Sequence, residues 1–249
     1  VASGEVRGGA PATREFALLD PVATVERVDA VVISGGSAFG LAACDGVVGW
    51  CEREGRGFPT PGGRVPIVVG MSLYDLTVGD GSVRPGPEQG LAACEAAPSQ
   101  ELGRVGAGCG ATVGSWRGAD HQLPGGLVGA VERDGDVVVA ALVAVNPWGD
   151  VVGHGHHGTP PPAPIDQPRS STCLAVVATN AALDPLGCQH AARGGHDGLA
   201  RSIDPPHCAA DGDAVVAVST GTATATSDQV RRMAVHVVER AVRSLPADR

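Results

Sequence analysis

The sequence predicts a mixed α/β fold, and three observations point to it. Apolar runs of strand length alternate with helical patterns along the chain. Two of these runs, 126–132 and 136–145, are joined by the turn Arg133-Asp134-Gly135, which is typical of a β-hairpin. The last pattern, 227–244, has apolar residues on one stripe and arginines outside it, as an amphipathic helix does. With 249 residues, 43% of them hydrophobic, the chain can bury a sizeable core.

The other elements follow from the same signals. The run DAVVIS predicts a strand at 29–34, which leads through two glycines into a helix at 37–54. A turn rich in proline and glycine leads to a strand at 65–69. Further along we expect a helix at 88–97, a glycine-rich bend at 106–114, an irregular loop at 154–168, a strand at 174–178, helices at 185–192 and 196–202, and a strand at 215–219.

Composition argues against several classes of protein. The net charge is −9, all 18 basic residues are arginine, and they form no basic stripe with interleaved aromatics, so we expect no nucleic-acid partner. No apolar run approaches the length that spans a membrane, so we expect no membrane partner. The 7 cysteines are widely spaced and include no C-x-x-C pair, which favours reduced thiols and a cytoplasmic location.

Two glycine-rich motifs invite functional readings that their context does not favour. VGAGCGATVG at 105–114 matches the dinucleotide fingerprint G-x-G-x-x-A, but SQELGR before it is not a strand, so we expect a tight bend or close packing instead. SGGSAFGL at 34–41 resembles the G-x-S-x-G nucleophile elbow, but its closing glycine, Gly40, falls one residue late. We interpret Ser37 as the N-cap of a strand-to-helix turn, whose free amides remain able to bind an anion.

The cluster HGHHG at 154–158 is the most metal-like feature of the chain. Catalytic zinc sites draw their ligands from rigid elements and usually include a carboxylate or a distant third ligand. These histidines lie in a loop, and the cysteines show no zinc spacing. The sequence therefore predicts no metal site and no cofactor.

Two further stretches place reactive side chains at strand ends. In ADGDAVVAVSTG, Asp211 and Asp213 flank a glycine just before a strand, where i and i+2 side chains point to the same side of an extended chain. A plain turn explains them, but such a pair also orients and deprotonates a nucleophile. In RSSTCLAVVATN, small hydroxyl and thiol residues at 170–173 stand where a proline-rich loop enters the core.

The chain resembles the DmpA-type aminopeptidases (L-aminopeptidase/D-esterase), whose relatives include β-peptidyl aminopeptidases and nylon-oligomer hydrolases. The matching motifs are VRGGAPATREFALLDP, VDAVVISGGSAFGLAACDGV, VPIVVGMSLYDLTVGD, GAGCGATVG, ALVAVNPWGD, TCLAVVATNAAL and HDGLARSIDPPHCAADGDAVVAVSTG, in this order over nearly the whole chain. The resemblance implies a four-layered α/β/β/α sandwich like that of N-terminal-nucleophile hydrolases, with its own connectivity. It also implies one hydrolase domain, 1–249, that lacks a few dozen N-terminal residues.

The resemblance further implies self-cleavage at the Ser171–Thr172 bond. This bond would divide the chain into an α-subunit part, 1–171, and a β-subunit part, 172–249. Thr172 would then be the N-terminal nucleophile, with its own α-amine as the nearby base, because the ordinary pKa of such an amine is about 8. The strand after Thr172 supplies rigid backbone for this acyl shift, and the proline-rich loop before it supplies freedom.

The same resemblance assigns roles to other residues. Asn146 would contribute to the oxyanion hole, while Asp211 and Asp213 would orient the Thr172 hydroxyl and amine. Tyr74 would line the substrate pocket, and Asp75 would bind a substrate's free ammonium group. The implied activity removes N-terminal residues from small peptides, amino-acid amides or esters, in a homo-oligomer of processed α/β pairs.

Two positions depart from the family pattern, and they keep alternatives open. Ser171 stands where the family usually has Asn or Gly, and Ser115 stands where it often has Lys. The alternatives are an acyltransferase that resembles ornithine acetyltransferase, with the same type of Thr nucleophile, and an unprocessed, non-catalytic protein that binds a small molecule.

The absence of a predicted metal site has a measurable consequence. Activity should survive incubation with EDTA, because an N-terminal threonine needs no metal for its chemistry. Hydrolysis measured before and after chelation checks this, and a loss of activity that zinc restores would contradict it.

Overall fold

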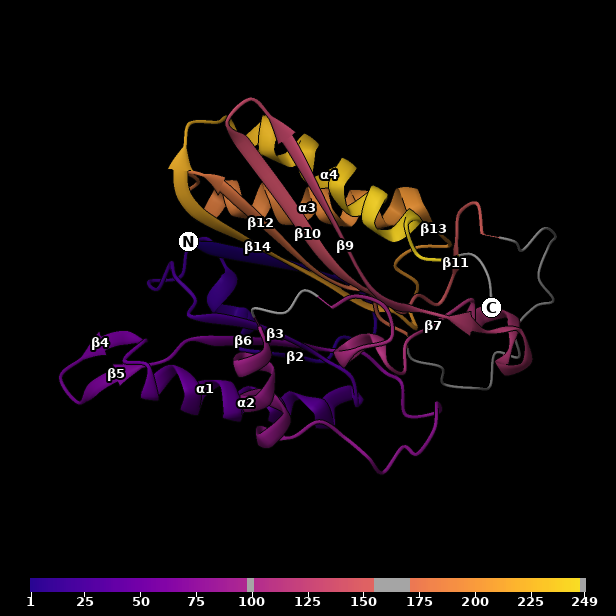
Figure 1. The fold of residues 1–249 in the computed structure, drawn as a ribbon. Helices are drawn as coiled ribbons and strands as arrows, with labels where there is room; N and C mark the ends of the chain where they lie inside the picture. The colour runs from indigo at the N-terminus through magenta and orange to yellow at the C-terminus, as the bar shows by residue number, and fades with distance from the viewer. Residues whose placement is uncertain (98–100, 155–170, 247–249) are drawn as a thin grey trace.

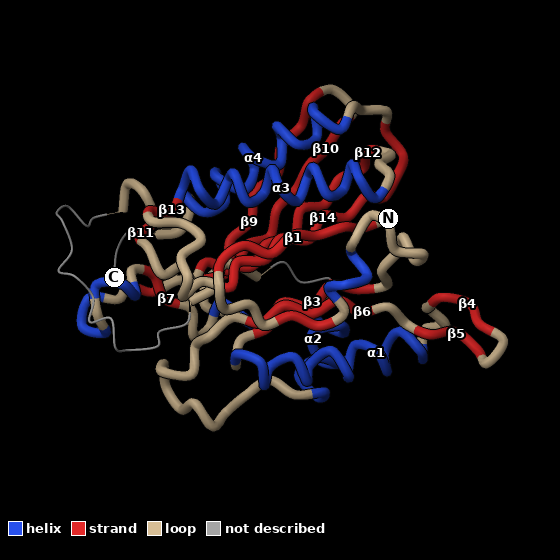
Figure 2. Tube along the Cα trace, turned by 180° about the vertical axis from the view of Figure 1, so that it is seen from behind, coloured by secondary structure: helices blue, strands red, loops and turns tan. Residues whose placement is uncertain are grey.

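Two β-sheets lie face to face between two pairs of helices in the computed structural model, which describes residues 1–97, 101–154 and 171–246 (Figures 1 and 2). Helices α3 (Pro185–Ser202) and α4 (Ser227–Arg243) cover the outer face of the larger sheet. Helices α1 (Ala43–Arg53) and α2 (Pro87–Ala96) cover the outer face of the smaller one. The mixed α/β fold and its four-layered α/β/β/α arrangement are confirmed.

The larger sheet has five strands in the order β1-β14-β12-β10-β9. Their bounds are β1 Ala2–Gly8, β14 Gly212–Ala223, β12 Leu174–Ala181, β10 Val137–Val145 and β9 Gly126–Asp134. Neighbouring strands are antiparallel except for β12 and β14, which run parallel with Leu174 opposite Ala214. The residues just before these two strands therefore lie side by side.

The smaller sheet brings a second set of segments together. It contains β2 (Thr13–Arg14), β6 (Val68–Ser72) and β3 (Ala30–Ser34) in that order. Strands β3 and β6 are parallel, with Ser34 opposite Ser72. The turn after β3 and the segment after β6 consequently leave the sheet at the same edge.

Short elements complete the described part of the chain. They are the strands β4 Phe58–Thr60, β5 Gly63–Val65, β7 Thr112–Val113, β8 Leu123–Pro124, β11 Asp150–Val151 and β13 Ile203–Asp204, and the 3-10 helices at Phe16–Leu19, Ser37–Ala42, Gly106–Gly108, Ser115–Arg117 and Ala119–His121. Strands β4 and β5 form a hairpin that projects beyond α1, at the opposite end of the molecule from β7, β11 and β13 (Figure 1).

Three apolar clusters fill the spaces between the layers. One packs α3 and α4 on the larger sheet, a second fills the space between the sheets, and the smallest joins α1 to the smaller sheet. The stripe predicted for the last helix is buried: Val230, Met233, Val237 and Val238 all belong to the first cluster. No helix in the described ranges is long and apolar enough to cross a membrane.

Several predicted elements are confirmed with small shifts of their ends. These are the strand at β3, the helix at α2, the β9–β10 hairpin, the strands at β12 and β14, and the last helix, α4. The 106–114 segment forms a short 3-10 helix and a two-residue strand, so the helix that a dinucleotide fingerprint requires is not formed there.

The predicted helix at 37–54 is wrong over its first six residues. A 3-10 helix occupies Ser37–Ala42, and α1 begins only at Ala43. Gly36 and Ser37 have φ of 83° and 55°, so the chain turns tightly, and Gly40 packs against the Gly35 carbonyl. Ser37 makes no side-chain capping bond, so its N-cap role is also wrong; its backbone N–H donates to the Leu73 carbonyl.

Three other expectations fail for identifiable reasons. The strand expected at 65–69 is split, because Pro66 has no N–H to donate, and β6 starts at Val68. The two helices expected at 185–202 are one helix, α3, because Gly194 and Gly195 pack against α4 and β14 instead of breaking it. Strand β1 has no counterpart among the predicted elements, since glycines and charges interrupt its apolar pattern.

The contact between α1 and α2 makes a stability prediction. A Cβ at Gly46 would overlap the Pro87 carbonyl, whereas a Cβ at Gly49, in the same helix, meets no described atom within 4 Å. Gly46→Ala should therefore destabilise the fold by about 1–3 kcal/mol through overpacking. Gly49→Ala, the matched control, should stabilise it by about 0.5–1 kcal/mol through helix propensity. Urea unfolding measures both, and equal effects would contradict the close packing.

Candidate functional site

The parallel pairing of β12 with β14 brings the residues around Thr172 beside those around Asp211. Ser171 forms a bridge with Asp211, and its N–H donates to the Ala210 carbonyl at 3.0 Å. One step further, the Ala214 N–H donates to the Cys173 carbonyl at 3.1 Å. Ser171, Thr172, Asp211 and Asp213 are buried, each with at most 2% of its surface exposed. The structure thus brings together side chains that the sequence places far apart.

Both polar groups of the Ser171–Thr172 peptide are hydrogen-bonded. Its N–H donates to the Asn146 carbonyl at 2.8 Å, and its carbonyl oxygen accepts from the Gly212 N–H at 2.9 Å. The Thr172 hydroxyl donates to the same carbonyl oxygen at 2.6 Å. A side chain at position 212 would collide with the Ala10 carbonyl, so a glycine is required for this approach.

Each oxygen of the two carboxylates has a donor. Asp213 accepts from the Cys173 N–H at 2.6 Å through Oδ1, and its Oδ2 lies 2.7 Å from His207 Nδ1. Asp211 accepts from the Trp148 N–H at 2.9 Å and from the Cys208 N–H at 2.8 Å. Asp213 therefore holds the backbone that follows Thr172, and Asp211 holds two other segments. The Thr172 hydroxyl donates to Ser171 and to neither aspartate.

Burial governs the protonation of this site. Burial first, and then the negative charge of Asp213, raise the pKa of Asp211 to about 7, against the two N–H donors that lower it. Burial also raises the pKa of the Cys173 thiol well above its usual value, so this thiol stays protonated. Near neutral pH, Asp211 is consequently able both to hold and to release a proton.

Asn146 connects Thr172 to the segment expected to line the substrate pocket. Its backbone carbonyl accepts from Thr172, while its side-chain amide donates to the Tyr74 carbonyl at 3.0 Å. Its side-chain oxygen accepts from the Thr112 N–H at 2.8 Å. The amide predicted to lie in an oxyanion hole is thus fixed between two other segments, 1% exposed.

Asp75 lies where the two glycine-rich motifs meet. Its Oδ1 accepts from the Gly36 N–H at 2.7 Å. A Cβ at Gly35 or at Gly110 would collide with its carboxylate. The glycines therefore serve close packing, as expected for the 106–114 motif, and what they pack against is a half-buried acid.

The segment with Ser115 contains an ion pair instead of the family's lysine. Ser115 is buried and accepts from Gln122 at 3.1 Å. Two residues later, Arg117 forms a two-pronged ion pair with Asp150 at 2.6 Å, with both side chains mostly buried. The backbone N–H of Trp116 donates to the backbone carbonyl of Trp148, so this segment is fixed to the loop that holds Asp211.

The loop expected between 154 and 168 falls almost wholly outside the described residues, as do His156 and His157. In the part of the chain that is described, no group of three or more His, Cys, Asp or Glu side chains is placed to hold a metal ion.

His207 is the site residue that sequence reasoning missed. It lies in the turn before Asp211, has a φ of 52°, and bonds to Asp213. A histidine that directly follows two prolines and lies six residues before the second aspartate was the available signal.

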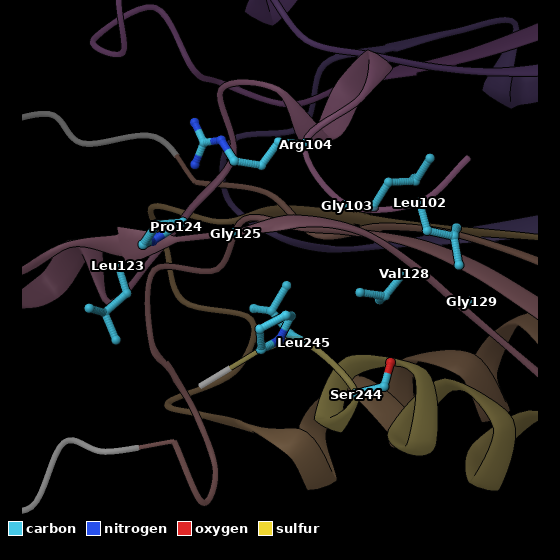
Figure 3. Close-up of a pocket in the computed structure, with 12 residues that line it drawn as sticks. Leu102, Gly103, Arg104, Leu123, Pro124, Gly125, Val128, Gly129, Ser244 and Leu245 are labelled. Atoms are coloured by element: carbon cyan, nitrogen blue, oxygen red, sulfur yellow. The ribbon is translucent and has the colours of Figure 1, made fainter. Parts of the chain in front are cut away.

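A sizeable apolar cavity lies elsewhere in the molecule. It has a volume of about 690 Å³ and opens between the 102–104 and 123–129 segments and the end of α4 (Figure 3). Leu102, Leu123, Val128 and Leu245 line it, and none of the predicted site residues does. It is therefore not the place where the reactive groups meet.

The raised pKa of Asp211 makes a prediction about stability. Because its folded pKa of about 7 exceeds the ordinary 3.8, the folded chain keeps a proton that the unfolded chain has lost, and this contribution disappears as the pH rises through 7. Burial lowers the pKa of His196 to about 3, so below pH 6.5 the unfolded chain takes up a proton that the folded chain does not. This histidine therefore lowers the stability as the pH falls, the opposite of the effect of Asp211. The two effects partly cancel in the native sequence.

Asp211→Asn should separate these effects. In an uncleavable Thr172→Ala background, its free energy of unfolding relative to Thr172→Ala alone should rise by on the order of 2 kcal/mol between pH 5 and pH 8. Urea unfolding at both pH values measures this. A pH-independent difference would show that Asp211 is not protonated in the folded chain.

Two aminopeptidases are among the solved structures that share this fold. The L-aminopeptidase D-Ala-esterase/amidase from Ochrobactrum anthropi superposes with a TM-score of 0.70 over 97% of this chain and 71% of its own, at 22% identity. A β-aminopeptidase from Burkholderia sp. gives 0.68 over 97% and 72%, at 20% identity. At such identities the likeness shows the fold alone.

Relatives found by comparing sequences have higher identities to this chain than these two structures have. An uncharacterised aminopeptidase from Mycobacterium leprae is 42% identical over 262 aligned residues, which cover 92% of this chain and 70% of the relative. A 6-aminohexanoate-oligomer endohydrolase from Kocuria sp. is 29% identical over 218, covering 77% and 60%. The resemblance inferred from the sequence motifs is confirmed. Because the profile of peptidase family S58 matches residues 1–245, the chain belongs to this family of hydrolases.

Proposed function

We propose that this protein cuts its own Ser171–Thr172 bond and then uses the freed Thr172 to remove N-terminal residues from small peptides, amino-acid amides or esters. The observation that supports this most is the state of that bond. It is buried, its N–H and carbonyl are both held by backbone partners, and the Thr172 hydroxyl lies 2.6 Å from the carbonyl oxygen. Such restraint holds a nucleophile beside its target and removes the entropic cost of bringing them together.

The processing step follows from these contacts. The Thr172 hydroxyl oxygen attacks the Ser171 carbonyl carbon, the peptide C–N bond breaks, and the hydroxyl proton passes to the leaving nitrogen. The Gly212 N–H, which already donates to the carbonyl oxygen at 2.9 Å, stabilises the negative charge that develops there. One water then hydrolyses the resulting ester, which restores the Thr172 hydroxyl and leaves a Ser171 carboxylate, and the proton released is taken up by the Thr172 amine that the first step freed.

Cleavage changes the electrostatics of the site. The new Thr172 ammonium is attracted to the carboxylate of Asp213, whereas the new Ser171 carboxylate is repelled by it and forms beside Asp211. Because these groups are buried, their interactions are much stronger than in water. The repulsion drives the end of the α-subunit part away from Thr172 and so makes room for a substrate.

In the processed enzyme, the groups around Thr172 take the catalytic roles. The Thr172 amine, once neutral, accepts the proton of its own hydroxyl. The Asn146 amide, which uses one N–H on the Tyr74 carbonyl, offers its second N–H to the tetrahedral intermediate. Asp211 and Asp213 orient the nucleophile through the backbone that they hold.

Asp75 supports a preference for substrates with a free amine. It follows Tyr74, whose carbonyl is bonded to Asn146, and its carboxylate is fixed by Gly36. A fixed carboxylate near the nucleophile recognises an ammonium group by charge. The relatives named as an aminopeptidase and an oligomer endohydrolase agree with hydrolysis of amide bonds.

The proposal predicts two fragments. Intact-mass measurement of the full chain after incubation should show cleavage between Ser171 and Thr172. Thr172→Ala should stay uncut, because no hydroxyl remains to attack, and Thr172→Ser should still split. The processed protein should release p-nitroaniline from amino-acid p-nitroanilides, and N-acetylation of the substrate should slow this release at least about tenfold.

The three parts of this proposal can be refuted separately. A wild-type chain that stays whole would refute the processing step. Splitting without release of p-nitroaniline would leave processing intact and refute the aminopeptidase activity. Equal rates on free and acetylated substrates would refute recognition of the amine.

A further inference from the structure

The group that holds Asp213 from the far side is a histidine with no assigned role. His207 Nδ1 lies 2.7 Å from Asp213 Oδ2, and the exposed fractions of the two side chains are 15% and 3%. The backbone of His207 has a φ of 52°, in the left-handed region that is uncommon for residues other than Gly, although His, like Asn and Asp, adopts it more often than most. This uncommon backbone conformation places the ring against the carboxylate.

The ring is restrained on its other sides by a buried part of α3. Its Nε2 lies 3.3 Å from the His196 carbonyl oxygen, and it packs edge-on against the His196 ring, with centroids 5.0 Å apart. Burial lowers the pKa of His196 to about 3, so this neighbour is uncharged at neutral pH. His196 Nε2 is bonded to the Glu5 carbonyl at 2.8 Å, which fixes the neighbour in turn.

The hydrogen-bond pattern indicates how protons are arranged. A backbone carbonyl only accepts, so the Nε2 that faces His196 has a hydrogen. A further hydrogen then lies between Nδ1 and Asp213 Oδ2, because two bare acceptors would not approach to 2.7 Å. His207 and Asp213 therefore share a hydrogen across this contact, and the ring holds the carboxylate in place.

The pair is linked directly to the nucleophile's backbone. Asp213 uses its other oxygen, Oδ1, to accept from the Cys173 N–H at 2.6 Å, and this N–H belongs to the peptide that joins Thr172 to Cys173. A chain of contacts thus runs from His207 through Asp213 to the peptide that follows Thr172.

We propose that His207 is a positioning residue for Thr172: its hydrogen bond to Asp213 keeps that carboxylate aimed at the Cys173 amide, which fixes the Thr172 hydroxyl beside the Ser171 carbonyl. This inference rests on the proposed function. It assigns His207 no contact with the substrate, and its effect passes through Asp213 alone.

Two substitutions suit the left-handed backbone at this position. His207→Gly removes the ring, and His207→Asn keeps one N–H donor near the position of Nδ1 but has no charge. His190→Ala is the control, because His190 is a partly buried histidine of α3 that bonds to Ser227 Oγ at 3.0 Å, away from the site. The melting temperature of each variant shows whether it folds.

The test follows splitting of the full chain over time by intact mass. His207→Gly should split about 10²-fold more slowly than wild type, since small displacements of a nucleophile cost rates of this order. Added imidazole should enter the vacated space and restore about tenfold of the rate or more. His207→Asn should be intermediate and insensitive to imidazole, and His190→Ala should match wild type.

A spectroscopic readout does not depend on activity. In uncleavable Thr172→Ala protein, a downfield imidazole N–H proton resonance should be present, and it should be lost on His207→Asn and on Asp213→Asn. The absence of this signal would contradict the His207–Asp213 hydrogen bond, and imidazole rescue of the splitting rate separates positioning from a merely structural role.

The outcomes separate the two proposals. A wild-type chain that never splits overturns the proposed function and this inference with it. A wild-type chain that splits no faster than a folded His207→Gly overturns only the inference, as does a slow His207→Gly that imidazole does not restore. If His207→Gly does not fold, a folded His207→Asn that splits at the wild-type rate overturns it.

Discussion

The register between β12 and β14 is the constraint on which the rest of the site depends. Because Leu174 lies opposite Ala214, Ser171 and Asp211 form a bridge at the mouth of the strands. A shift by one residue would turn every side chain of β12 to the other face of the sheet. Asp213 would then lose the Cys173 N–H, and the Ser171 carbonyl would lose the Gly212 N–H. The backbone pairing of the two strands therefore sets where the reactive groups lie, and side-chain contacts add to this.

Two neighbouring buried carboxylates are costly, because burial removes water and like charges repel. The chain offsets this cost with donors for all four oxygens, three of them backbone N–H groups, from Trp148, Cys173 and Cys208. The acids in turn order the loop after β10, the start of β12 and the turn before β14. Removing one of these carboxylates would disturb several segments at once. The two aspartates therefore stabilise the fold as well as the candidate site.

The sequence predicts those parts of the fold that local pattern determines. The β9–β10 hairpin and α4 have clear periodicity and turn chemistry, and both are confirmed. Strand β1 has no such pattern, because its place is set by pairing with the distant β14. Helix α3 contains two glycines that look like a break, yet they let it approach α4 and the sheet closely. These outcomes depend on tertiary contacts that no short stretch of sequence contains.

The candidate site, like the fold, is predictable from the sequence only in part. The aspartate pair is visible from its spacing, and Thr172 and Asn146 from the family motifs. The contact between His207 and Asp213 is not visible, because it depends on a left-handed turn. Nor do the motifs show that the Asn146 backbone, rather than its side chain, meets the Thr172 N–H. Spacing and motifs select residues, but which atom meets which is decided by the backbone.

The position of Asp75 has a consequence for anyone who would redesign this part of the molecule. Its carboxylate lies against Gly35 and Gly110, which belong to two different segments, and it is held by Gly36. A longer acid at position 75 would have to displace backbone from both segments, and a side chain on either glycine would push the acid away. A library that varies residue 75 alone would therefore sample few folded sequences with a longer acid at that position. Moving this charge requires concerted changes in three distant stretches of the chain.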